Sequence, residues 1–413
     1  MPIEKQFDLV IVGGGLVGAS LAVALRGSGL KIGVVERWPI ASDSQPSYDE
    51  RTVALTWSAR CIFSGMGVWG DIADDAEAIR DIHVSGRGAP GATHLSRRHA
   101  GTAALGYVVP TRVIGGVLMS AIQQSADIQL ICPAEATDLT AQGDERQLTV
   151  TVGDEQWVLT TPLVVCADGG RSGLAGDAAL PVTAYTPEPL LIIVSTNRPH
   201  TGRAWERFSS EGPLALLPLR NSRLAVVWTC LPETLSLRKS LPDDEFIDQL
   251  QTAFGDRAGS FSNPTPRKSY PLNRGHLQCP ATERRVVIGN AAHTVHPVAG
   301  QGFNLGLRDV AALAELLFYA SQSGKDPGDE ALLMEYARLR RRDTFMVSQF
   351  THGLISLFST DTPPLPLLRS LGLSGIEFMP PVKRFLLNRT MGLSGKQGRL
   401  ARGLPLERRT ALV

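Results

Sequence analysis

Three glycines and one acid near the start of the chain have the spacing of a phosphate-binding turn. Gly13, Gly15 and Gly18 follow an apolar stretch at residues 7–12, and Glu36 comes 18 residues after the last glycine. This G-x-G-x-x-G pattern allows a tight turn, a backbone that approaches a pyrophosphate, and close packing of a helix on a strand. The start of such a helix presents N–H groups to the phosphates, and Glu36 is placed to accept hydrogen bonds from ribose hydroxyls. The spacing therefore predicts a strand, a turn, a helix and a second strand that bind a dinucleotide.

The same segment is apolar enough to be compared with a membrane span. Seventeen uncharged residues lie between Asp8 and Arg26, which is close to the length that crosses a bilayer. However, the three successive glycines from Gly13 to Gly15 are costly inside a helix. The acids Glu4 and Asp8 also do not fit the positively charged start of a signal peptide. We therefore expect a dinucleotide-binding turn here, and neither a membrane helix nor a leader.

The bulk composition narrows the class of protein. The chain has 413 residues, with 41 Lys and Arg against 40 Asp and Glu, so its net charge gives no reason to expect a nucleic-acid partner. The length suits two or three domains. The five cysteines are scattered and form no C-x-x-C pair. This pattern argues against a disulfide framework and a metal site, and it favours a reducing cytoplasm.

Two later segments have the same strand-then-turn pattern. LVVCADGGRSGLA, from Leu163, is an apolar strand that runs into Asp168 and a glycine turn. RRVVIGNAAHTVHPVAGQGFNLGLRDVAALAEL, from Arg284, is a strand, a turn at Asn290, a glycine-rich loop and an apolar helix. In this order, the three motifs resemble the fingerprints of the FAD-dependent aromatic hydroxylases, the group similar to para-hydroxybenzoate hydroxylase. The resemblance implies non-covalent FAD, with NAD(P)H as the electron donor.

Further segments narrow the resemblance to the hydroxylases of aerobic ubiquinone biosynthesis. They are DERTVAL, IHVSGRG, GRAWERF, GPLALLP and the third motif itself, and the matching segments extend to about Gly306. The resemblance implies that NAD(P)H and O2 are used to hydroxylate 2-polyprenyl-6-methoxyphenol to the benzoquinol. Two alternatives stay open. One is a sister hydroxylase for another ring position or another aromatic substrate, and the other is a flavin-binding protein without turnover inside a biosynthetic complex.

The resemblance also implies which residues surround the cofactor. Asp168 would serve FAD and NAD(P)H binding, and Asn290 would accept a hydrogen bond from the ribityl chain of FAD. The glycine-rich loop opens a buried helix, so its backbone amides are expected to meet negative charge on the flavin. No catalytic side chain is assigned, because the cofactor carries the oxygen chemistry. The expected cofactor-binding residues are Gly13, Gly15, Gly18, Glu36, Arg37, Arg51, Arg112, Asp168, Asn290, Pro297, Gly300, Gln301, Gly302 and Asn304.

Some positions depart from the family or allow two interpretations. Most of the wider family has Asp where this chain has Asn290, whose side-chain oxygen still accepts a hydrogen bond. The wider pattern also has an arginine three residues after Ser172, where this chain has Ala175, so the choice between NADH and NADPH stays open. His293 and His296 could ionise a phenol, or they could bond to backbone groups and shape the loop. The sequence does not decide between these two roles.

The motifs divide an expected α/β fold into three parts. A Rossmann-like FAD-binding domain is expected at residues 1–180, and residues 280–345 complete it because the third motif lies there. Residues 181–279 alternate short apolar runs with Pro, Gly and Asn. This alternation predicts an inserted antiparallel β-sheet that forms the substrate-binding domain. Residues 346–413 are expected to form a helical C-terminal segment.

The end of the chain, from Pro380 to Val413, is strongly basic. Eight Lys or Arg lie there against one acid, Glu407, and apolar residues such as Phe385 and Met391 lie between them. Such a segment suits peripheral contact with an anionic membrane surface, where a polyprenylated phenol substrate would be met. A solvated basic tail, or contact with other ubiquinone-biosynthesis proteins, fits the same residues. We expect a cytoplasmic protein with at most peripheral contact with the inner membrane.

Overall fold

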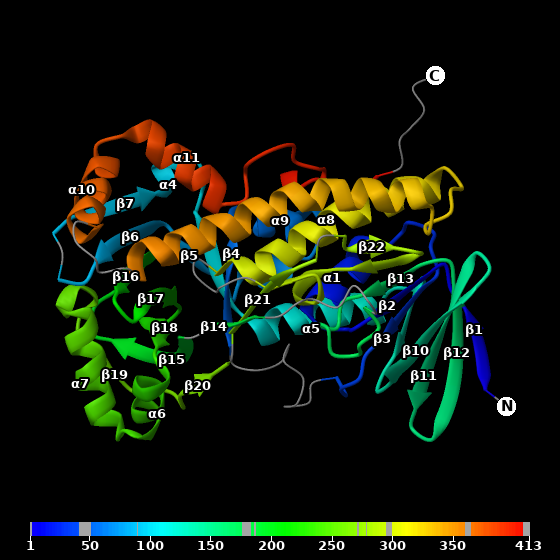
Figure 1. Cartoon of the computed structure of the whole chain (residues 1–413), viewed down its shortest axis with the longest axis horizontal. Helices are drawn as coiled ribbons and strands as arrows, with labels where there is room; N and C mark the ends of the chain where they lie inside the picture. Colours follow the sequence, from blue (N-terminus) through cyan, green and yellow to red (C-terminus); the bar gives the residue numbers. More distant parts are fainter. Residues whose placement is uncertain are drawn as a thin grey trace.

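The computed structural model describes residues 2–40, 51–88, 90–175, 183–185, 187–270, 272–277, 279–294, 300–359 and 365–407. Within these residues the chain folds into five β-sheets with helices around them, and the expected α/β fold class is confirmed (Figure 1). A parallel sheet lies on the right of Figure 1 and a large, mostly antiparallel sheet on the left. The long C-terminal helices lie along the top of both.

A buried parallel sheet carries the three motifs. Its strand order is β22-β23-β13-β2-β3-β9, and every strand except the edge strand β22 runs parallel to its neighbours. The strands are β2 (Leu9–Val12), β3 (Ile32–Val35), β9 (Ile128–Ile131), β13 (Val164–Cys166), β22 (Ala281–Thr282) and β23 (Arg285–Val287). All residues of β2, β3 and β13 are buried. Burial on both faces explains why these strands are uninterrupted apolar runs.

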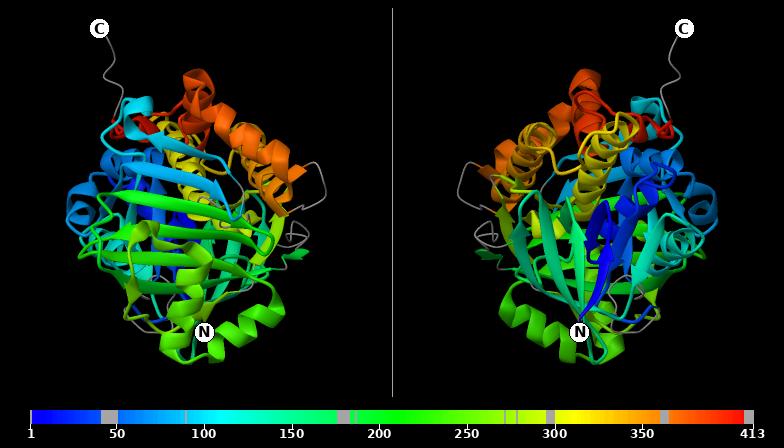
Figure 2. Two further views of the ribbon diagram at one scale, coloured as in Figure 1. Left: turned by 90° about the vertical axis from the view of Figure 1, so that its left-hand side faces the viewer. Right: turned by 90° about the vertical axis from the view of Figure 1, so that its right-hand side faces the viewer.

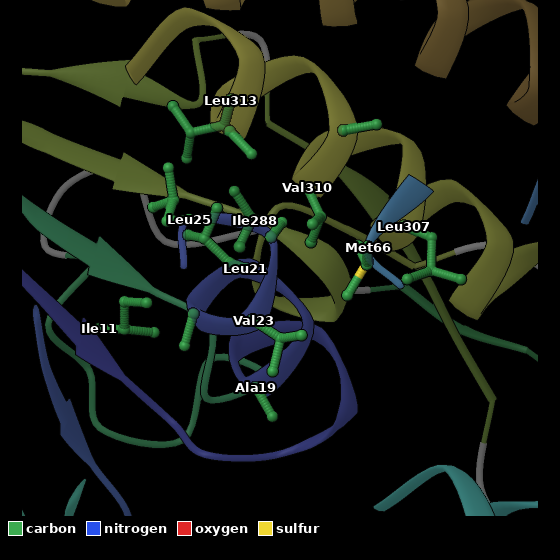
Figure 3. Packing of buried hydrophobic residues seen from close by; sticks show 14 of the residues in the cluster. Ile11, Ala19, Leu21, Val23, Leu25, Met66, Ile288, Leu307, Val310 and Leu313 are labelled. Carbon is green, nitrogen blue, oxygen red and sulfur yellow. The ribbon is translucent and has the colours of Figure 1, made fainter. Parts of the chain in front are cut away.

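Three helices pack on one face of this sheet: α1 (Leu16–Ala24), α5 (Thr111–Gln123) and α8 (Gln301–Gln322). Leu21 of α1 lies against Val310 and Leu313 of α8 in one buried cluster, together with Ile11 of β2 (Figure 3). Full burial of such a side chain contributes about 1.5–3 kcal/mol. The cluster therefore holds α8 firmly against the glycine-rich helix α1.

The other face of the parallel sheet packs on a four-stranded sheet. Its order is β1-β12-β11-β10, with the bounds β1 (Ile3–Gln6), β10 (Glu135–Gln142), β11 (Glu145–Val152) and β12 (Glu155–Thr161). Val10 of β2 shares a cluster with Leu148 of this second sheet, whereas its neighbour Ile11 packs on the helices. The alternation follows from the two-residue repeat of a strand. The parallel sheet is thus covered on both sides.

The large sheet has eight strands. Its order is β19-β15-β18-β17-β16-β6-β7, with β20 paired to β15. The bounds are β6 (Asp81–Gly86), β7 (Ala92–Ser96), β15 (Glu188–Thr196), β16 (Arg203–Ser209), β17 (Gly212–Leu219), β18 (Arg223–Cys230), β19 (Phe261–Ser262) and β20 (Lys268–Ser269). Strands β6 and β7 come from outside residues 181–279, and β6 joins the sheet parallel to β16. The sheet therefore combines two distant stretches of chain.

The two faces of the large sheet have different covers. Helices α6 (Pro232–Ser240) and α7 (Asp243–Phe254) cover one face, here called the outer face, where Trp205 and Phe254 share a buried cluster. The other face, here called the inner face, packs on a three-stranded sheet of β4 (Thr52–Thr56), β5 (Glu77–Ile79) and β8 (Gly106–Pro110). The left view of Figure 2 looks toward the large sheet, with the C-terminal helices in orange above it.

The C-terminal helices are part of the fold. They are α9 (Glu330–Ser359), α10 (Leu365–Glu377) and α11 (Pro380–Thr390). Leu387 and Met391 are buried against the inner face of the large sheet, and Leu400 is buried in the same cluster as α1 and α8. The expected helical C-terminal segment is therefore confirmed. Among the helices that the structure describes, none has the length and apolar character needed to cross a membrane.

Shorter elements connect the two halves of the molecule. Helices α2 (Trp57–Gly65), α3 (Trp69–Ala73) and α4 (Arg97–Ala100) follow strands of the small and large sheets. A further three-stranded sheet pairs β21 (Leu272–His276) with β14 (Thr183–Tyr185) and with β24 (His293–Thr294). Through this pairing, β21, which follows the last strand of the large sheet, contacts β24 in the third motif.

Candidate cofactor site

The glycines of the first motif form a turn that has no room for side chains. Gly13 has φ +104°, and a Cβ atom there would lie 2.8 Å from the backbone of Ala167, at the end of β13. A Cβ on Gly18 would lie 1.9 Å from the carbonyl oxygen of Gly13. Gly15 is the N-cap of α1 and no side chain caps that helix, so its first N–H groups remain available to a phosphate.

Glu36 is held in place at the end of β3. Its Oε2 accepts a hydrogen bond of 2.7 Å from Gly14 N–H, and its Oε1 accepts one of 2.9 Å from Trp38 N–H. The residue is buried. Each carboxylate oxygen has a second lone pair, so Glu36 can still accept from a ribose while the backbone fixes its position.

A groove with a volume of about 400 Å³ runs past the ends of these strands. Residues from all three motifs line it, although they are far apart in the sequence. The structure thus brings one subset of the expected cofactor residues together. This subset is Gly13, Gly15, Glu36, Arg37, Arg51, Asp168 and Asn290.

Asp168 shapes the loop that follows β13. Its Oδ1 accepts a hydrogen bond of 3.1 Å from Gly170 N–H, and its Oδ2 accepts one of 2.5 Å from Ser172 N–H. Because the carboxylate is engaged with this turn, its first effect is to fix the loop at the edge of the groove. Asn290, by contrast, is exposed in the groove and follows the left-handed Gly289.

At the start of α8, two expected cofactor residues use their side chains to bind other parts of the chain. Asn304 is buried, its Oδ1 accepts from Thr56 N–H at 2.8 Å, and its Nδ2 donates to Ala54 O at 2.8 Å. Gln301 Nε2 donates to Thr390 O at 3.3 Å. These bonds fix the start of α8 against β4 and α11.

The glycines of this loop differ from each other in their surroundings. Gly300 is the N-cap of α8 with φ +62°, and a Cβ there would lie 3.1 Å from Ala54. A Cβ on Gly302 would meet nothing within 4 Å, so this position faces open space. Pro297 and His296 lie outside the described residues.

The three arginines expected at the cofactor have different environments. The guanidinium of Arg51 lies 4.7 Å from the ring centre of Tyr270, and Arg51 lines the groove. Arg37 also lines it, but its side chain is 54% exposed and pairs with Glu135 at 3.2 Å. Arg112 is exposed in the first turn of α5 and is not among the residues that line the groove.

His293 has a structural role in this geometry. Its Nε2 lies 2.5 Å from Oδ2 of Asp309, which also accepts from Gly289 N–H at 3.0 Å. Arg340 Nε donates to Oδ1 of Asp309 at 2.6 Å. Burial raises the pKa of Asp309, but the charges of His293 and Arg340 lower it by more, to about 2. The carboxylate is thus ionised and fixes the turn that presents Asn290.

Four residues that line the groove were not predicted from the motifs. Thr111, Trp38, Arg171 and Phe303 all line it. Phe303 and Arg171 lie inside the quoted motifs, so their position was a usable signal. Residues 134–136 also line the groove, but nothing local in the sequence shows that the start of β10 lies beside the end of β3.

Comparison with known proteins identifies the family. The chain matches the FAD binding domain family over residues 6–351. It is 36% identical over 408 residues to the ubiquinone hydroxylase UbiL of Rhodospirillum rubrum, which covers 98% of this chain and 94% of that protein. It is 30% identical to the 3-demethoxyubiquinol 3-hydroxylase of Escherichia coli, over 94% of this chain and 100% of that protein.

A solved structure agrees with the fold. The p-nitrophenol 4-monooxygenase PnpA from Pseudomonas putida DLL-E4 superimposes with a TM-score of 0.78 at 17% identity, over 96% of this chain and 100% of that chain. The chain therefore belongs to the FAD binding domain family, and it is a flavin-dependent hydroxylase of that family. The glycine turn without room for side chains, the fixed Glu36 and the groove that joins the motifs fit FAD.

Proposed function

We propose that this protein hydroxylates the aromatic ring of 2-polyprenyl-6-methoxyphenol in aerobic ubiquinone biosynthesis. One atom of O2 enters the ring to give the benzoquinol, the other leaves as water, and NAD(P)H supplies the two electrons. The observation that carries the proposal is likeness along almost the whole chain to named ubiquinone hydroxylases. The groove that unites the three motifs supports it.

The residues of this chain would bind and orient the cofactor. FAD, when bound and reduced, activates O2; the protein positions it and excludes water. In this proposal Glu36 accepts from the adenosine ribose, the first N–H groups of α1 bind the pyrophosphate, and Asn290 accepts from a ribityl hydroxyl. The start of α8 would face the flavin ring, where its backbone amides would stabilise negative charge. Asn304 contributes by holding that helix start in position.

We also propose a domain division. Residues 1–180 and 280–345 form the FAD-binding domain, with the exception of β6 and β7, and residues 181–279 together with these two strands form the substrate-binding domain. The shared sheet supports this assignment, since β6 pairs with β16 over its whole length. The exchange of strands ties the substrate sheet to the cofactor domain at two places in the chain.

A second candidate function is hydroxylation at another position of a ubiquinone precursor. The Escherichia coli relative, which the chain matches over that protein's whole length, is named a 3-demethoxyubiquinol 3-hydroxylase. The same cofactor groove would serve either reaction. A flavin-binding protein without turnover is the remaining alternative.

Product analysis tests these candidates. The purified yellow protein is incubated with NADH or NADPH, O2 and either a short-chain 2-prenyl-6-methoxyphenol or a short-chain demethoxyubiquinol. We expect NAD(P)H consumption to match formation of the benzoquinol from the phenol. Product from the demethoxyubiquinol alone would favour the second candidate, and consumption without any hydroxylated product would reject both. Gly15→Val, which places a branched side chain at the pyrophosphate position, should lose FAD and serves as the inactive control.

We further propose that the substrate is met at a membrane surface, because burial of each methylene of its tail in lipid contributes about 0.8 kcal/mol. The corner between α10 and α11 is the candidate contact: Phe378 is 83% exposed, Met379 52% and Phe385 64%. Basic Arg384 is exposed beside them. Leu387 and Met391 belong to the core, so truncation of the whole basic segment would damage the fold.

Point substitutions test this contact without truncation. Phe378→Ser with Phe385→Ser should reduce co-flotation with phosphatidylglycerol vesicles and leave FAD content unchanged. Leu237→Ser, at a 53% exposed residue of α6, is the matched control and should bind as the parent protein does. Undiminished vesicle binding by the double variant would reject this surface.

A further inference from the structure

An unpaired carboxyl group lies in the middle of the large sheet. Glu206 belongs to the segment GRAWERF and lies on β16. Among the described residues, no group donates a hydrogen bond to its carboxyl and no cation pairs with it. Glu206 is partly buried, and a carboxyl that is withdrawn from solvent without a partner calls for a physical explanation.

Strand pairing places Glu206 on the inner face of the sheet. It lies directly opposite Ala215 on β17 and Val84 on β6, and residues paired in this way share a face. Its neighbour Trp205 belongs to the outer-face cluster, and the guanidinium of Arg207 donates to Phe254 O at the end of α7. Successive side chains of a strand point to opposite faces, so Glu206 points inward.

The inner face is the one that turns toward the cofactor site. Ala204, two residues before Glu206, packs in the inner-face cluster together with Ala54 of β4. Ala54 O accepts the hydrogen bond from Asn304 near the start of α8, and Ala54 lies 3.1 Å from the Cβ position of Gly300. Strand β4 therefore contacts both the inner face of the large sheet and the start of α8, where we place the flavin ring.

Glu206 is partly buried on the inner face rather than fully packed. Along β16 it lies between Ala204, which packs in one inner-face cluster, and Phe208, which packs with Leu373 of α10 in another. Burial raises the pKa of its carboxyl from 4.5 to about 7. The residue nevertheless keeps part of its accessible surface. A side chain that keeps accessible surface on this face can be reached by a ligand.

We propose that Glu206 binds the phenolic hydroxyl of the aromatic substrate and accepts its proton during ring hydroxylation; this inference rests on the proposed function. The O–H bond of the phenol breaks, the proton moves to a carboxylate oxygen of Glu206, and the electron pair stays on the phenol oxygen. This charge makes the ring carbon more nucleophilic toward the oxygen atom that it receives.

The proton then returns, so that the step balances. After oxygen transfer the former phenol carbon carries a carbonyl, and Glu206 gives its proton back to that oxygen as the ring becomes aromatic again. The hydrogen lost from the ring carbon leaves as a proton and joins the second oxygen atom of O2, which departs as water. The two electrons that reduce this oxygen atom come from NAD(P)H.

The surroundings of Glu206 suit a proton acceptor at neutral pH. The efficiency of a general base is greatest when its pKa lies near the working pH. From the neighbouring strands, the inner-face residues opposite it, Val84 and Ala215, carry no charge. On α9, Arg340 and Asp343 bind each other at 2.6 Å.

One charged group of α10 and one of α11 near this face bind each other. Glu377, whose side chain is described at the end of α10, binds Lys383 at 2.8 Å and His94 N–H at 2.8 Å. Burial raises the pKa of Glu377, but the bond from Lys383 and the other donors lower it by more, to about 2. These groups are therefore engaged with each other and do not pair with Glu206.

The test compares Glu206→Gln with Glu206→Asp in the FAD-loaded protein. Substrates are a short-chain 2-prenyl-6-methoxyphenol and its ring-fluorinated analogue, whose hydroxyl is more acidic. The readouts are FAD content, kcat and KM for hydroxylation between pH 5 and 9, and the ultraviolet spectrum of the bound phenol, which distinguishes phenol from phenolate. Glu188→Gln is the matched control, because Glu188 is paired with the outer-face residue Cys230 on the same sheet.

We expect Glu206→Gln to keep FAD and to lower kcat for the phenol by about 100-fold, the usual size of a lost general base. In this variant the rise of kcat/KM near pH 7 should disappear. The loss of kcat should be smaller with the fluorinated phenol. The spectrum should show that the bound phenol stays protonated. Glu206→Asp should retain the rise, and Glu188→Gln should behave as the parent protein does.

Other outcomes would overturn the assignment. They are an unchanged pH profile in Glu206→Gln, an equal loss with both phenols, and a loss of FAD, which would make Glu206 structural. If the parent protein hydroxylates no phenol, the proposed function fails, and the spectrum of the bound phenol still reports whether Glu206 takes its proton. The two failures are therefore separate observations.

Discussion

Asp309 in the cofactor half is fully buried and Glu206 in the substrate half is partly buried, and the two carboxyl groups have opposite environments. Asp309 is bonded to His293, to Gly289 N–H and to Arg340, whereas Glu206 has no partner within the described residues. Burial raises the pKa of each. At Asp309 the neighbouring charges lower the pKa to about 2, while at Glu206 nothing opposes burial and the pKa is about 7.

The difference in partners distinguishes a carboxylate that stabilises the fold, Asp309, from a carboxyl that in our proposal binds a ligand, Glu206. Asp309 must be ionised at every physiological pH, because it holds the backbone turn on which Asn290 is presented. Glu206 bonds to no backbone group, so its burial lowers stability and no hydrogen bond within the protein compensates for the loss. The two halves of the molecule therefore use the same chemical group for different ends.

The largest expected effect comes from removal of the satisfied carboxylate. Asp309→Asn should lower the free energy of unfolding by about 3 kcal/mol, since it removes one of the two counter-charges of the buried guanidinium of Arg340 and leaves Asp343 as the other. Urea denaturation of the FAD-loaded protein measures this loss. Asp326→Asn, at a carboxylate that is 41% exposed and pairs with Arg284, is the control and should cost less than about 1 kcal/mol. Equal losses would show that burial does not distinguish the two pairs.

Removal of the unpaired carboxyl should have the opposite sign. The folded pKa of Glu206 is about 7 against an ordinary 4.5, so wild-type stability falls as pH rises from about 4 to 7 and then levels. Glu206→Gln abolishes this penalty and should stabilise the protein by at most about 3 kcal/mol at pH 8, at about 1.4 kcal/mol per pKa unit. At pH 4 the two proteins should unfold at the same urea concentration. A difference independent of pH would mean that the carboxyl is solvated.

A smaller effect is expected at Asn290, whose partner in our proposal is the cofactor. Asn290→Asp should retain FAD, because either side chain offers an acceptor. Asn290→Leu should weaken FAD binding by about 1–3 kcal/mol, the cost of an unpaired buried partner. Fluorescence titration of the apoprotein with FAD measures both variants. If the Leu variant binds FAD as tightly as the parent protein, Asn290 is not a ligand of the ribityl chain.

The parts that could be predicted from the sequence are those whose constraints are local. The glycine spacing, the apolar runs on either side of it and Glu36 lie within 30 residues, and short-range geometry is enough to relate them. The side chains of Gln301 and Asn304 could not be placed, because their partners are Thr390 and the strand β4, each far away in the sequence. A motif shows that these residues belong to a site, but only the fold shows which atoms they contact.

The large sheet shows the same limit. Alternating runs predicted strands within residues 181–279, but no local signal shows that β6 pairs with β16, about 120 residues further on. The isolated carboxyl of Glu206 is also invisible in the segment GRAWERF, where an acid between an aromatic and an arginine looks like an ordinary surface residue. Its environment depends on which face of the sheet is covered, and that is decided by distant helices.

The strand order of the parallel sheet has a consequence for how the protein is made. Strand β2 pairs with β13, and β13 pairs with β23 at residues 285–287, so the glycine turn leaves the ribosome long before the last strand beside it. At about 5–20 residues per second, the interval between Glu36 and Asn290 is roughly 10–50 s. During that time the nascent chain exposes the Val- and Ile-rich edge of an unfinished sheet and has no complete nucleotide site. The flavin can therefore act only late in biogenesis, as a ligand that stabilises the finished fold.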